Sequence, residues 1–314
     1  MQSLLKQGSD IVDFTVGICA NGEARNLLAL LEGIRSEWTP DSMRLARIVL
    51  VASDCDPDVL LCIKQRAQND SRIFVLEESQ RHGKADAVNK IIRNSLGSYV
   101  VFINSDAMPR RGSIQRLVSA MESNQRAGVI SACPYFEVRD SPLSQVEALM
   151  WNIHNQSSLL LNHMQISNHS SDEMMVVRRV SLEELPSGLV NDGAYLAGCA
   201  KARGYLVNFC EDARVRIDVP SSFLGLIQQR RRIIYGHFQI RKLIGEAPRT
   251  VEALMFSSPG LALSIVLRAL RKSPRLALFL PLAILSEGIS TMLAAADALR
   301  KQNKHGVWRR YGRN

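Results

Sequence analysis

Short apolar runs alternate with longer amphipathic segments from residue 13 to about residue 132. The apolar runs have the length of strands and are rich in valine and isoleucine, which predicts buried strands at 14–19, 46–52, 72–76, 98–103 and 128–131. The segments between them repeat apolar residues at helical spacing, at 24–38, 57–68, 84–95 and 111–124. This alternation predicts an α/β fold with a doubly wound, mostly parallel, Rossmann-like sheet.

A longer helix is expected over residues 141–164, followed by the polar loop 167–173. The helix carries Trp151, His154 and His163, which either line a ligand groove or pack the helix against the sheet. Further strands are expected at 174–177 and 205–209, with a loop and a helix across residues 187–204 in between, so the α/β pattern extends beyond residue 200.

The composition changes after Gly236, where two apolar stretches, 254–270 and 276–299, flank a basic bridge at 268–275. Only the second reaches the roughly 20 residues of a membrane span. A span or a hairpin would carry basic residues across the membrane, against the positive-inside tendency. We therefore expect interfacial or re-entrant helices with the basic clusters on the cytoplasmic face; a true span and a buried soluble hairpin are the alternatives. The predicted domains are 1–245 and 246–314.

Net charge and cysteine usage indicate which partners and which cellular location to expect for the protein. The formal net charge is +9, with many basic residues in the last third, so an anionic partner is expected. Nucleic acid is not expected, because aromatic residues make up 6% of the chain and no nucleic-acid-binding motif is present. An anionic membrane surface fits the basic and apolar pattern. The six scattered cysteines and the lack of a signal-like start predict a reducing, cytoplasmic location.

Polar residues follow the predicted strands at the edge where α/β sheets bind ligands. Glu23 and Asp54 follow the first two strands, where a carboxylate can bind a nucleoside or cap the next helix. Lys84 follows Gly83 at a helix start, an arrangement that can hold an anion, although the spacing is not that of a Walker A loop. Asn104 and Asp106 follow the fourth strand and offer oxygen ligands to a hard cation.

Two later segments complete the candidate chemistry. Residues 191–193, Asn-Asp-Gly, place the carboxylate of Asp192 before a predicted helix. Residues 229–239 begin with Gln229 and a run of three arginines that ends at Arg232. The arginines can bind a diphosphate in bidentate fashion, or form a solvated or lipid-facing cluster.

In this order and spacing, the segments 81–89, 104–109, 191–196 and 229–239 resemble the motifs of family 2 glycosyltransferases of the membrane-associated branch. The resemblance covers roughly residues 13–240 and implies a GT-A fold and a nucleotide-sugar donor. Asn104 and Asp106 match the D-x-D motif, so Asp106 would hold Mg²⁺ or Mn²⁺, while Asn104, which replaces the first aspartate, would hydrogen-bond a sugar hydroxyl or bind metal weakly. The nucleotide would be held by Glu23, Asp54, Lys84 and Asn89.

The resemblance implies a general base and an arginine box, and the sequence departs from both. Counting back from residues 204–205 places Gly193 at the usual base position, so either Asp192 serves after a shift of one residue, or another group does, or catalysis is lost. Segment 229–233 resembles Q-x-x-R-W, in which Gln229 would hold the acceptor and Arg231 and Arg232 would assist the leaving group. Ile233 replaces the tryptophan, which favours transfer of one sugar over polymer synthesis.

We therefore expect an inverting glycosyltransferase that moves one sugar from a UDP-sugar to a lipid, lipid-linked or saccharide acceptor at the cytoplasmic membrane face. Residues 1–245 would form the catalytic domain, with a C-terminal membrane-associated helical region and basic tail. The alternative is a catalytically degenerate scaffold that binds nucleotide, membrane or partners. A nucleotidyltransferase is a third possibility, but the loop after the first strand, residues 20–26, has one glycine, Gly22, where such enzymes have a glycine-rich loop.

Overall fold

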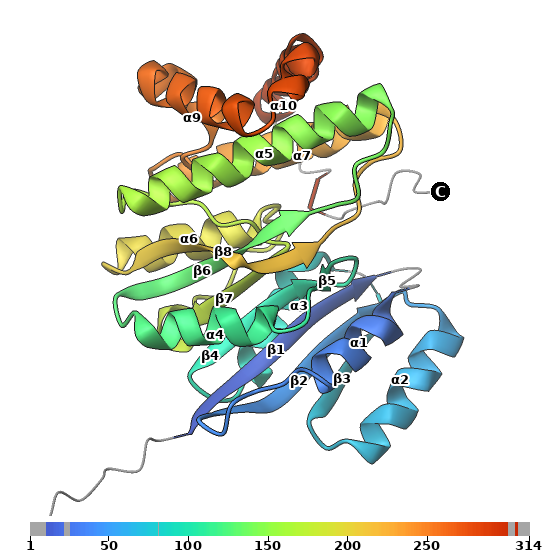
Figure 1. The fold of residues 1–314 in the computed structure, drawn as a ribbon. Coiled ribbons are helices and arrows are strands. Elements are labelled where there is room, and N and C mark those ends of the chain that lie inside the picture. The colour runs from blue at the N-terminus through green and yellow to red at the C-terminus, as the bar shows by residue number, and fades with distance from the viewer. Residues whose placement is uncertain (1–10, 22–25, 81, 301–304, 307–314) are drawn as a thin grey trace, which may run out of the picture.

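The computed structural model describes residues 11–21, 26–80, 82–300 and 305–306. Strands and helices alternate through the first half of the chain, as the sequence predicts (Figure 1). The strands are β1 (Val12–Asn21), β2 (Met43–Ser53), β3 (Ile73–Glu78), β4 (Tyr99–Asn104), β5 (Met108–Pro109), β6 (Ala127–Tyr135), β7 (Met174–Arg178) and β8 (Leu206–Arg216). The α-helices are α1 (Leu27–Arg35), α2 (Pro57–Asn69), α3 (Lys84–Asn94), α4 (Ser113–Ser123), α5 (Pro142–His163), α6 (Asp192–Ala202), α7 (Phe223–Ile244), α8 (Val251–Ser257), α9 (Pro259–Lys272) and α10 (Leu280–Leu299).

One eight-stranded sheet forms the centre of the fold, in the order β3-β2-β1-β4-β7-β6-β8-β5. β1 is parallel to β2 and β4, whereas β7 is antiparallel to both of its neighbours. The chain first builds outward from β1 to β3 and then returns to add β4 on the other side of β1. In α/β sheets, ligands bind beyond the carboxyl ends of the strands at such a reversal. Here those ends are Asn21 and Asn104.

Both faces of the sheet are covered by helices. Successive side chains of a strand point to opposite faces, so Ile48 and Leu50 of β2 pack with residues of α1, α2 and α4, while Val49 and Val51 pack with residues of α3 and α6. All four side chains are buried. The strands are therefore held on both faces, and the residues at their carboxyl ends rest on a rigid support.

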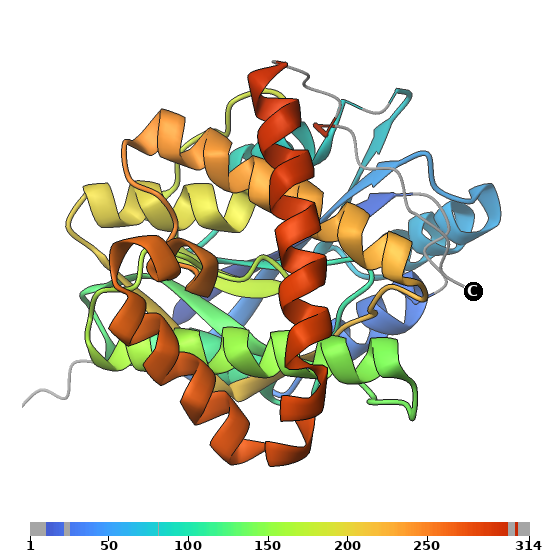
Figure 2. The ribbon, with the colours of Figure 1, turned by 90° about the horizontal axis from the view of Figure 1, so that it is seen from above.

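The C-terminal helices form a further layer over α5 and α7. Figure 2 shows α10 crossing above both. The predicted apolar stretch 254–270 is divided at Ser258 into α8 and α9, because Pro259 begins a helix, a position that tolerates proline. α7 ends at Ile244 and is capped by Gly245, whose φ of +84° is a conformation that glycine adopts readily. The division of the chain after residue 245 stays a prediction.

Among the helices of the described residues, one segment is long and apolar enough to cross a membrane, judged by length and composition alone. It runs over Pro274–Leu299, 26 residues, with a mean hydropathy of 1.8 in its most apolar window, of which 17% is buried. Whether it spans, lies on or stays outside a membrane remains a prediction from the sequence.

Candidate active site

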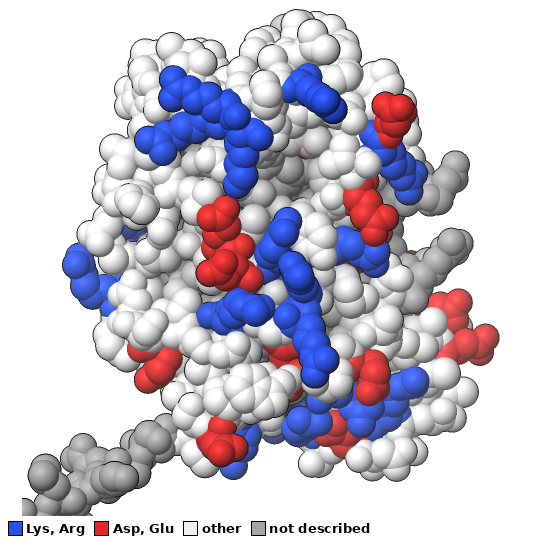
Figure 3. Space-filling view, in the orientation of Figure 1, with Lys and Arg blue, Asp and Glu red and all other residues white. Residues whose placement is uncertain are grey.

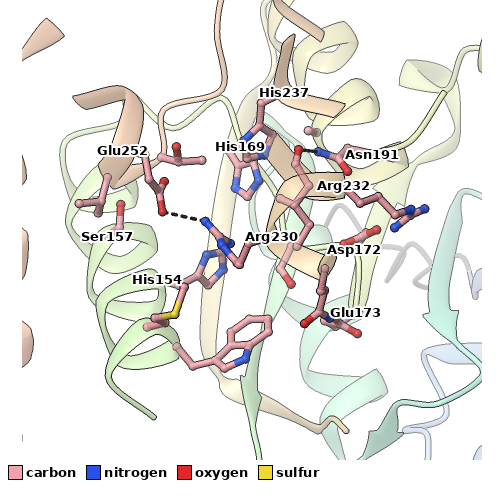
Figure 4. A pocket seen from close by; sticks show the side chains of 18 of the residues that line it. His154, Ser157, His169, Asp172, Glu173, Asn191, Arg230, Arg232, His237 and Glu252 are labelled. Carbon is pink, nitrogen blue, oxygen red and sulfur yellow. Dashed lines mark hydrogen bonds and ion pairs between the residues drawn. The ribbon is translucent and has the colours of Figure 1, made fainter. Parts of the chain in front are cut away.

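A cavity of about 810 Å³ opens at the carboxyl ends of β1, β2 and β4 and continues between the C-terminal helices. We call the part lined by Asn21, Ser53, Asn104 and Asp106 the sheet end. The other part, the helix end, is lined by residues of α5, α8, α9 and α10, by Arg230 and His237 of α7, and by His169 of the loop between α5 and β7. Figure 4 shows several of these side chains. The sheet end lies where the strand order predicts a ligand.

Lys84 begins α3 and lines the cavity, as the sequence predicts. Its Nζ lies 3.0 Å from Asp172 Oδ2 and 2.9 Å from Asp192 Oδ1. Burial disfavours the ammonium, but these two carboxylates outweigh it and raise the pKa of Lys84. A lysine that stays charged at a helix start, where Gly83 provides no capping side chain, is suited to bind a diphosphate.

Asn104 and Asp106 both line the sheet end, and the structure adds a carboxyl group that the sequence analysis missed. Asn104 Nδ2 donates a hydrogen bond of 3.0 Å to Oε2 of Glu173, which also lines the cavity. Burial and the negative charges of Asp172 and Asp106 raise the pKa of Glu173 to about 8. Two mutually repelling carboxyl groups and an amide oxygen form an oxygen donor set of the kind that binds Mg²⁺ or Mn²⁺, so these residues fit a divalent cation.

Gly193, at the position where the family pattern has the general base, lies against Asp172. A Cβ added to Gly193 would lie 2.9 Å from Asp172 Cβ and 3.0 Å from the carbonyl oxygen of Ser170, so no side chain fits there. Asp172 lines the cavity and its side chain is 36% exposed, whereas the side chain of Asp192 is 4% exposed and does not line the cavity. The resemblance implied that Asp192 is the general base, but its side chain does not line the cavity. Asp172 faces the cavity, and Asp192 forms an ion pair with Lys84.

The two aspartates differ in pKa. Burial and the charge of Asp172 raise the pKa of Asp192 to about 6, although Lys84 opposes the rise. Burial also opposes ionisation of Asp172, but Lys84 and a hydrogen bond with Asp192 hold the pKa of Asp172 below its usual value. Asp172 is therefore ionised at neutral pH, and Asp192 is the member of the pair that takes up a proton first as the pH falls.

The arginine box lies on α7, and its residues diverge because consecutive helical side chains point about 100° apart. Gln229 and Arg232 line the cavity, as expected. Arg231 does not: its Nε and Nη2 atoms each lie 2.6 Å from a carboxylate oxygen of Asp297 on α10. This corrects the predicted position of Arg231, which ties α7 to α10.

Two other predicted residues, Asn89 and Asp54, lie away from the cavity. Asn89 is buried and uses both amide atoms on Leu185, donating to its oxygen at 2.9 Å and accepting from its nitrogen at 2.7 Å. Asp54 is exposed and has a positive φ of 53°. Glu23 lies outside the described residues. The nucleotide contacts predicted for Asn89 and Asp54 are therefore not supported by where these side chains lie.

The helix end contains four aromatic rings in edge-to-face contact, from Trp151 through His154 and His169 to His237, with centroids 5.3 to 5.8 Å apart. The sequence analysis named Trp151 and His154 as possible groove residues; both line the cavity, whereas His163 is exposed at the end of α5 and does not. The other two histidines were not singled out, although His169 lies in the predicted polar loop 167–173 and His237 in the motif segment 229–239. The cavity thus joins charged groups at the sheet end to neutral rings at the helix end.

The sequence model described as "Glycosyl transferase family 2" matches residues 15–186, which is more than half of the chain. No curated protein sequence matches the chain. The match covers β1 to β7 and includes Lys84, Asn104, Asp106 and Asp172, so the residues of the sheet end lie within it.

Many solved structures match the chain, among them these two. Mannosyltransferase PcManGT from Pyrobaculum calidifontis, in complex with GDP-Man and Mn²⁺, is 20% identical with a TM-score of 0.63 and covers 95% of this chain and 92% of its own. GalNAc-T7 with UDP, GalNAc and Mn²⁺ is 11% identical with a TM-score of 0.52, and the likeness covers 80% of this chain and 57% of that one. The predicted GT-A fold class is confirmed.

Proposed function

Because the chain belongs to glycosyl transferase family 2 and is a glycosyltransferase, we propose that it moves one sugar from a nucleoside-diphosphate sugar to a lipid or lipid-linked acceptor. The observation that carries this proposal is the cavity, which places Lys84, Asp106 and Asp172 at the carboxyl ends of the strands beside the neutral rings of the helix end. The donor is a UDP-sugar or a GDP-sugar, the two nucleotide classes named for the similar structures.

We place the donor diphosphate at the sheet end, between α3 and α7. Lys84 and Arg232 both line this region and provide positive charge for the departing diphosphate. Asp106, Glu173 and the Asn104 oxygen would hold the divalent cation, which when bound neutralises charge on the diphosphate. Mn²⁺ in both similar structures supports this assignment.

Asp172 is the general base in this proposal. It is ionised and reaches the cavity beside His169 of the same loop, so it can accept the proton of an acceptor hydroxyl while that oxygen attacks the sugar carbon. A single displacement of this kind inverts the configuration at that carbon. Lys84, at 3.0 Å, keeps the carboxylate in place and charged. Gln229 lines the same cavity and can orient the acceptor sugar.

We further propose that the protein acts at the cytoplasmic face of a membrane with anionic lipids. Large apolar side chains of α8 and α10 are exposed, among them Phe256 at 91% and Ile284 at 63%. Figure 3 shows lysine and arginine side chains gathered over α9 beside an uncharged surface, and Arg268, Arg271 and Lys272 of α9 are exposed. Vesicle flotation tests this proposal. We expect binding to phosphatidylglycerol vesicles but not to phosphatidylcholine vesicles. Binding to neither kind of vesicle, or equal binding to both, would contradict it.

Donor turnover tests the proposed activity. Full-length protein in vesicles, supplied with Mn²⁺ and individual UDP-sugars or GDP-sugars, should transfer sugar to a lipid-extractable product from one donor. Asp106→Ala should lower the rate at least about 100-fold. The matched control is Asp41→Ala, which removes an exposed carboxylate far from the cavity and should leave the rate unchanged. Equal rates for Asp106→Ala and the parent would refute the assignment.

A further inference from the structure

The helix end of the cavity has a chemistry that distinguishes between classes of acceptor. Its polar groups are contributed by α5, α7, α8 and α10 and by the loop between α5 and β7, and its apolar lining includes Leu161, Met255, Leu263 and Ile284. Met255, Leu263 and Ile284 are also exposed on the outer surface of the C-terminal helices. The cavity therefore connects the catalytic groups with the apolar outer face, which gives an alkyl chain a continuous apolar path.

Positive charge at the helix end is already compensated. Arg230 places Nε and Nη2 at 2.8 Å from the two carboxylate oxygens of Glu287. Its Nη2 also lies 2.8 Å from Glu252, as Figure 4 shows. Arg249 pairs with Glu246 at 2.9 Å and donates to the oxygen of Ile166. A phosphate entering here would meet the two carboxylates around Arg230 without the divalent cation that we assign to the sheet end, and would be repelled.

The histidines add no positive charge. Burial, followed by the neighbouring His169 and Arg230, lowers the pKa of His154 to about 3. Burial likewise lowers the pKa of His237 to about 3 and lowers that of His169. At neutral pH the three rings are therefore uncharged, and each carries one nitrogen that donates and one that accepts a hydrogen bond.

Several polar atoms here have no hydrogen-bond partner among the described residues: His154 Nε2, Ser157 Oγ and His237 Nε2. Buried polar atoms in proteins are normally paired, so atoms left in this way around a cavity point to a bound molecule that pairs with them. Neutral donors and acceptors, two carboxylates and the face or edge of Trp151 are the groups that bind sugar hydroxyls and sugar rings.

From these contacts we propose that the helix end recognises an uncharged sugar head group carried on an alkyl chain, so that the acceptor is a neutral glycolipid and not a lipid phosphate. The proposal rests on the proposed function and specifies its acceptor. The head group lies among the three histidines, Glu252 and Trp151, with its hydroxyl toward Asp172. The chain passes Leu263 and Ile284 to the outer face.

Fluorescence of Trp151 tests the proposal without knowledge of the donor. The chain has three tryptophans, so replacing Trp38 and Trp308 by phenylalanine leaves Trp151 as the reporter. The full-length variant on nanodiscs that contain phosphatidylglycerol is titrated with dodecyl maltoside, dodecyl phosphate and maltose. Dodecyl maltoside should change the fluorescence and bind at least about tenfold more tightly than either of the others. Tighter binding of dodecyl phosphate, or equal binding of all three, would overturn the proposal.

Histidine variants locate the effect. His154→Phe and His237→Phe keep a ring of similar shape but remove the nitrogens, and each should weaken dodecyl maltoside binding by up to about tenfold. His163→Phe is the matched control, because His163 is exposed outside the cavity, and should bind like the parent. Nucleotide binding, measured by calorimetry, checks the fold of each variant. If the parent protein binds no nucleotide, the result counts against the proposed function. If both histidine variants bind dodecyl maltoside as tightly as the parent, the result counts against the acceptor proposal alone.

Discussion

Asp172 lies against Gly193: a Cβ on the glycine would come within 2.9 Å of Asp172 Cβ. The family pattern expects a carboxylate near position 193, and here a carboxylate from a different segment stands beside that position. The loop before β7 thus brings a charged group to the place where α6 begins. We infer that the chain has moved its base to another loop and has kept its activity.

Exchange of the two aspartates by asparagine separates their roles. Asp172→Asn should lower sugar transfer at least about 100-fold, because the general base is lost, while nucleotide binding persists. Asp192→Asn should lower transfer less, because this residue acts through Lys84 at 2.9 Å and does not line the cavity. Initial rates at saturating donor measure both. A larger loss in Asp192→Asn than in Asp172→Asn would return the base to Asp192.

Substitution of Gly193 by alanine tests the close approach directly. The added methyl group would press on Asp172 and on the Ser170 carbonyl, so we expect a loss of about 1 to 3 kcal/mol in the free energy of unfolding. Gly33→Ala in α1 is the control: no atom lies within 4 Å of its added Cβ, and the helix should gain about 0.5 to 1 kcal/mol. Urea unfolding compares the two, and a neutral Gly193→Ala would show that Asp172 is free to move aside.

Adjacent arginines of α7 should behave differently. Arg231→Ala leaves the buried carboxylate of Asp297 without this partner and should cost about 3 kcal/mol of stability, although His305 stays at 2.8 Å from the same carboxylate. Arg232→Ala should lower the transfer rate with a smaller change in stability, because Arg232 lines the cavity. Thermal unfolding and initial rates on both variants provide the comparison. The reverse pattern would contradict the assigned positions.

The neutral histidines predict how stability depends on pH. In the unfolded chain His154 and His237 bind a proton near pH 6.5, but in the folded protein their pKa values are about 3. The unfolded state therefore holds more protons between these values, and the free energy of unfolding falls as the pH decreases below 6.5. The loss is about 1.4 kcal/mol per pH unit for each histidine.

Charged neighbours modify this dependence without reversing it. His169 and Arg230 lower the pKa values of both rings further, while Glu252 and Asp172 raise them. Urea unfolding at pH 7 and pH 5 should show a smaller loss of stability in His154→Phe than in the parent, while His163→Phe should lose as much as the parent. Equal losses in all three proteins would mean that the ring of His154 is not held neutral.

The fold was largely predictable, because buried strands and amphipathic helices leave periodic patterns in the sequence. The positions of Lys84, Asn104 and Asp106 were predictable for a related reason: each follows a glycine or a strand at the sheet edge where ligands bind. Asp172 and Glu173 were not singled out, although an acidic pair directly before a strand is a signal of the same kind.

Other positions depend on contacts between distant segments. The rotation of α7 decides that Arg230 and Arg232 line the cavity and that Arg231 does not, and the partner of Arg231 is 66 residues away in sequence. Asn89 lies near the nucleotide motif but bonds the backbone of Leu185, 96 residues further on. Sequence spacing places such residues on an element; the packing of that element decides what each side chain contacts.

Calorimetric titration with UDP and with GDP, each with and without Mn²⁺, tests the central claim most directly, because it requires no acceptor. We expect one nucleotide to bind in a Mn²⁺-dependent manner, and Asp106→Ala to weaken that binding at least about tenfold while Asp41→Ala has no effect. Binding of neither nucleotide, or binding that is indifferent to both Mn²⁺ and Asp106, would contradict a metal-dependent donor site at the ends of β1 and β4.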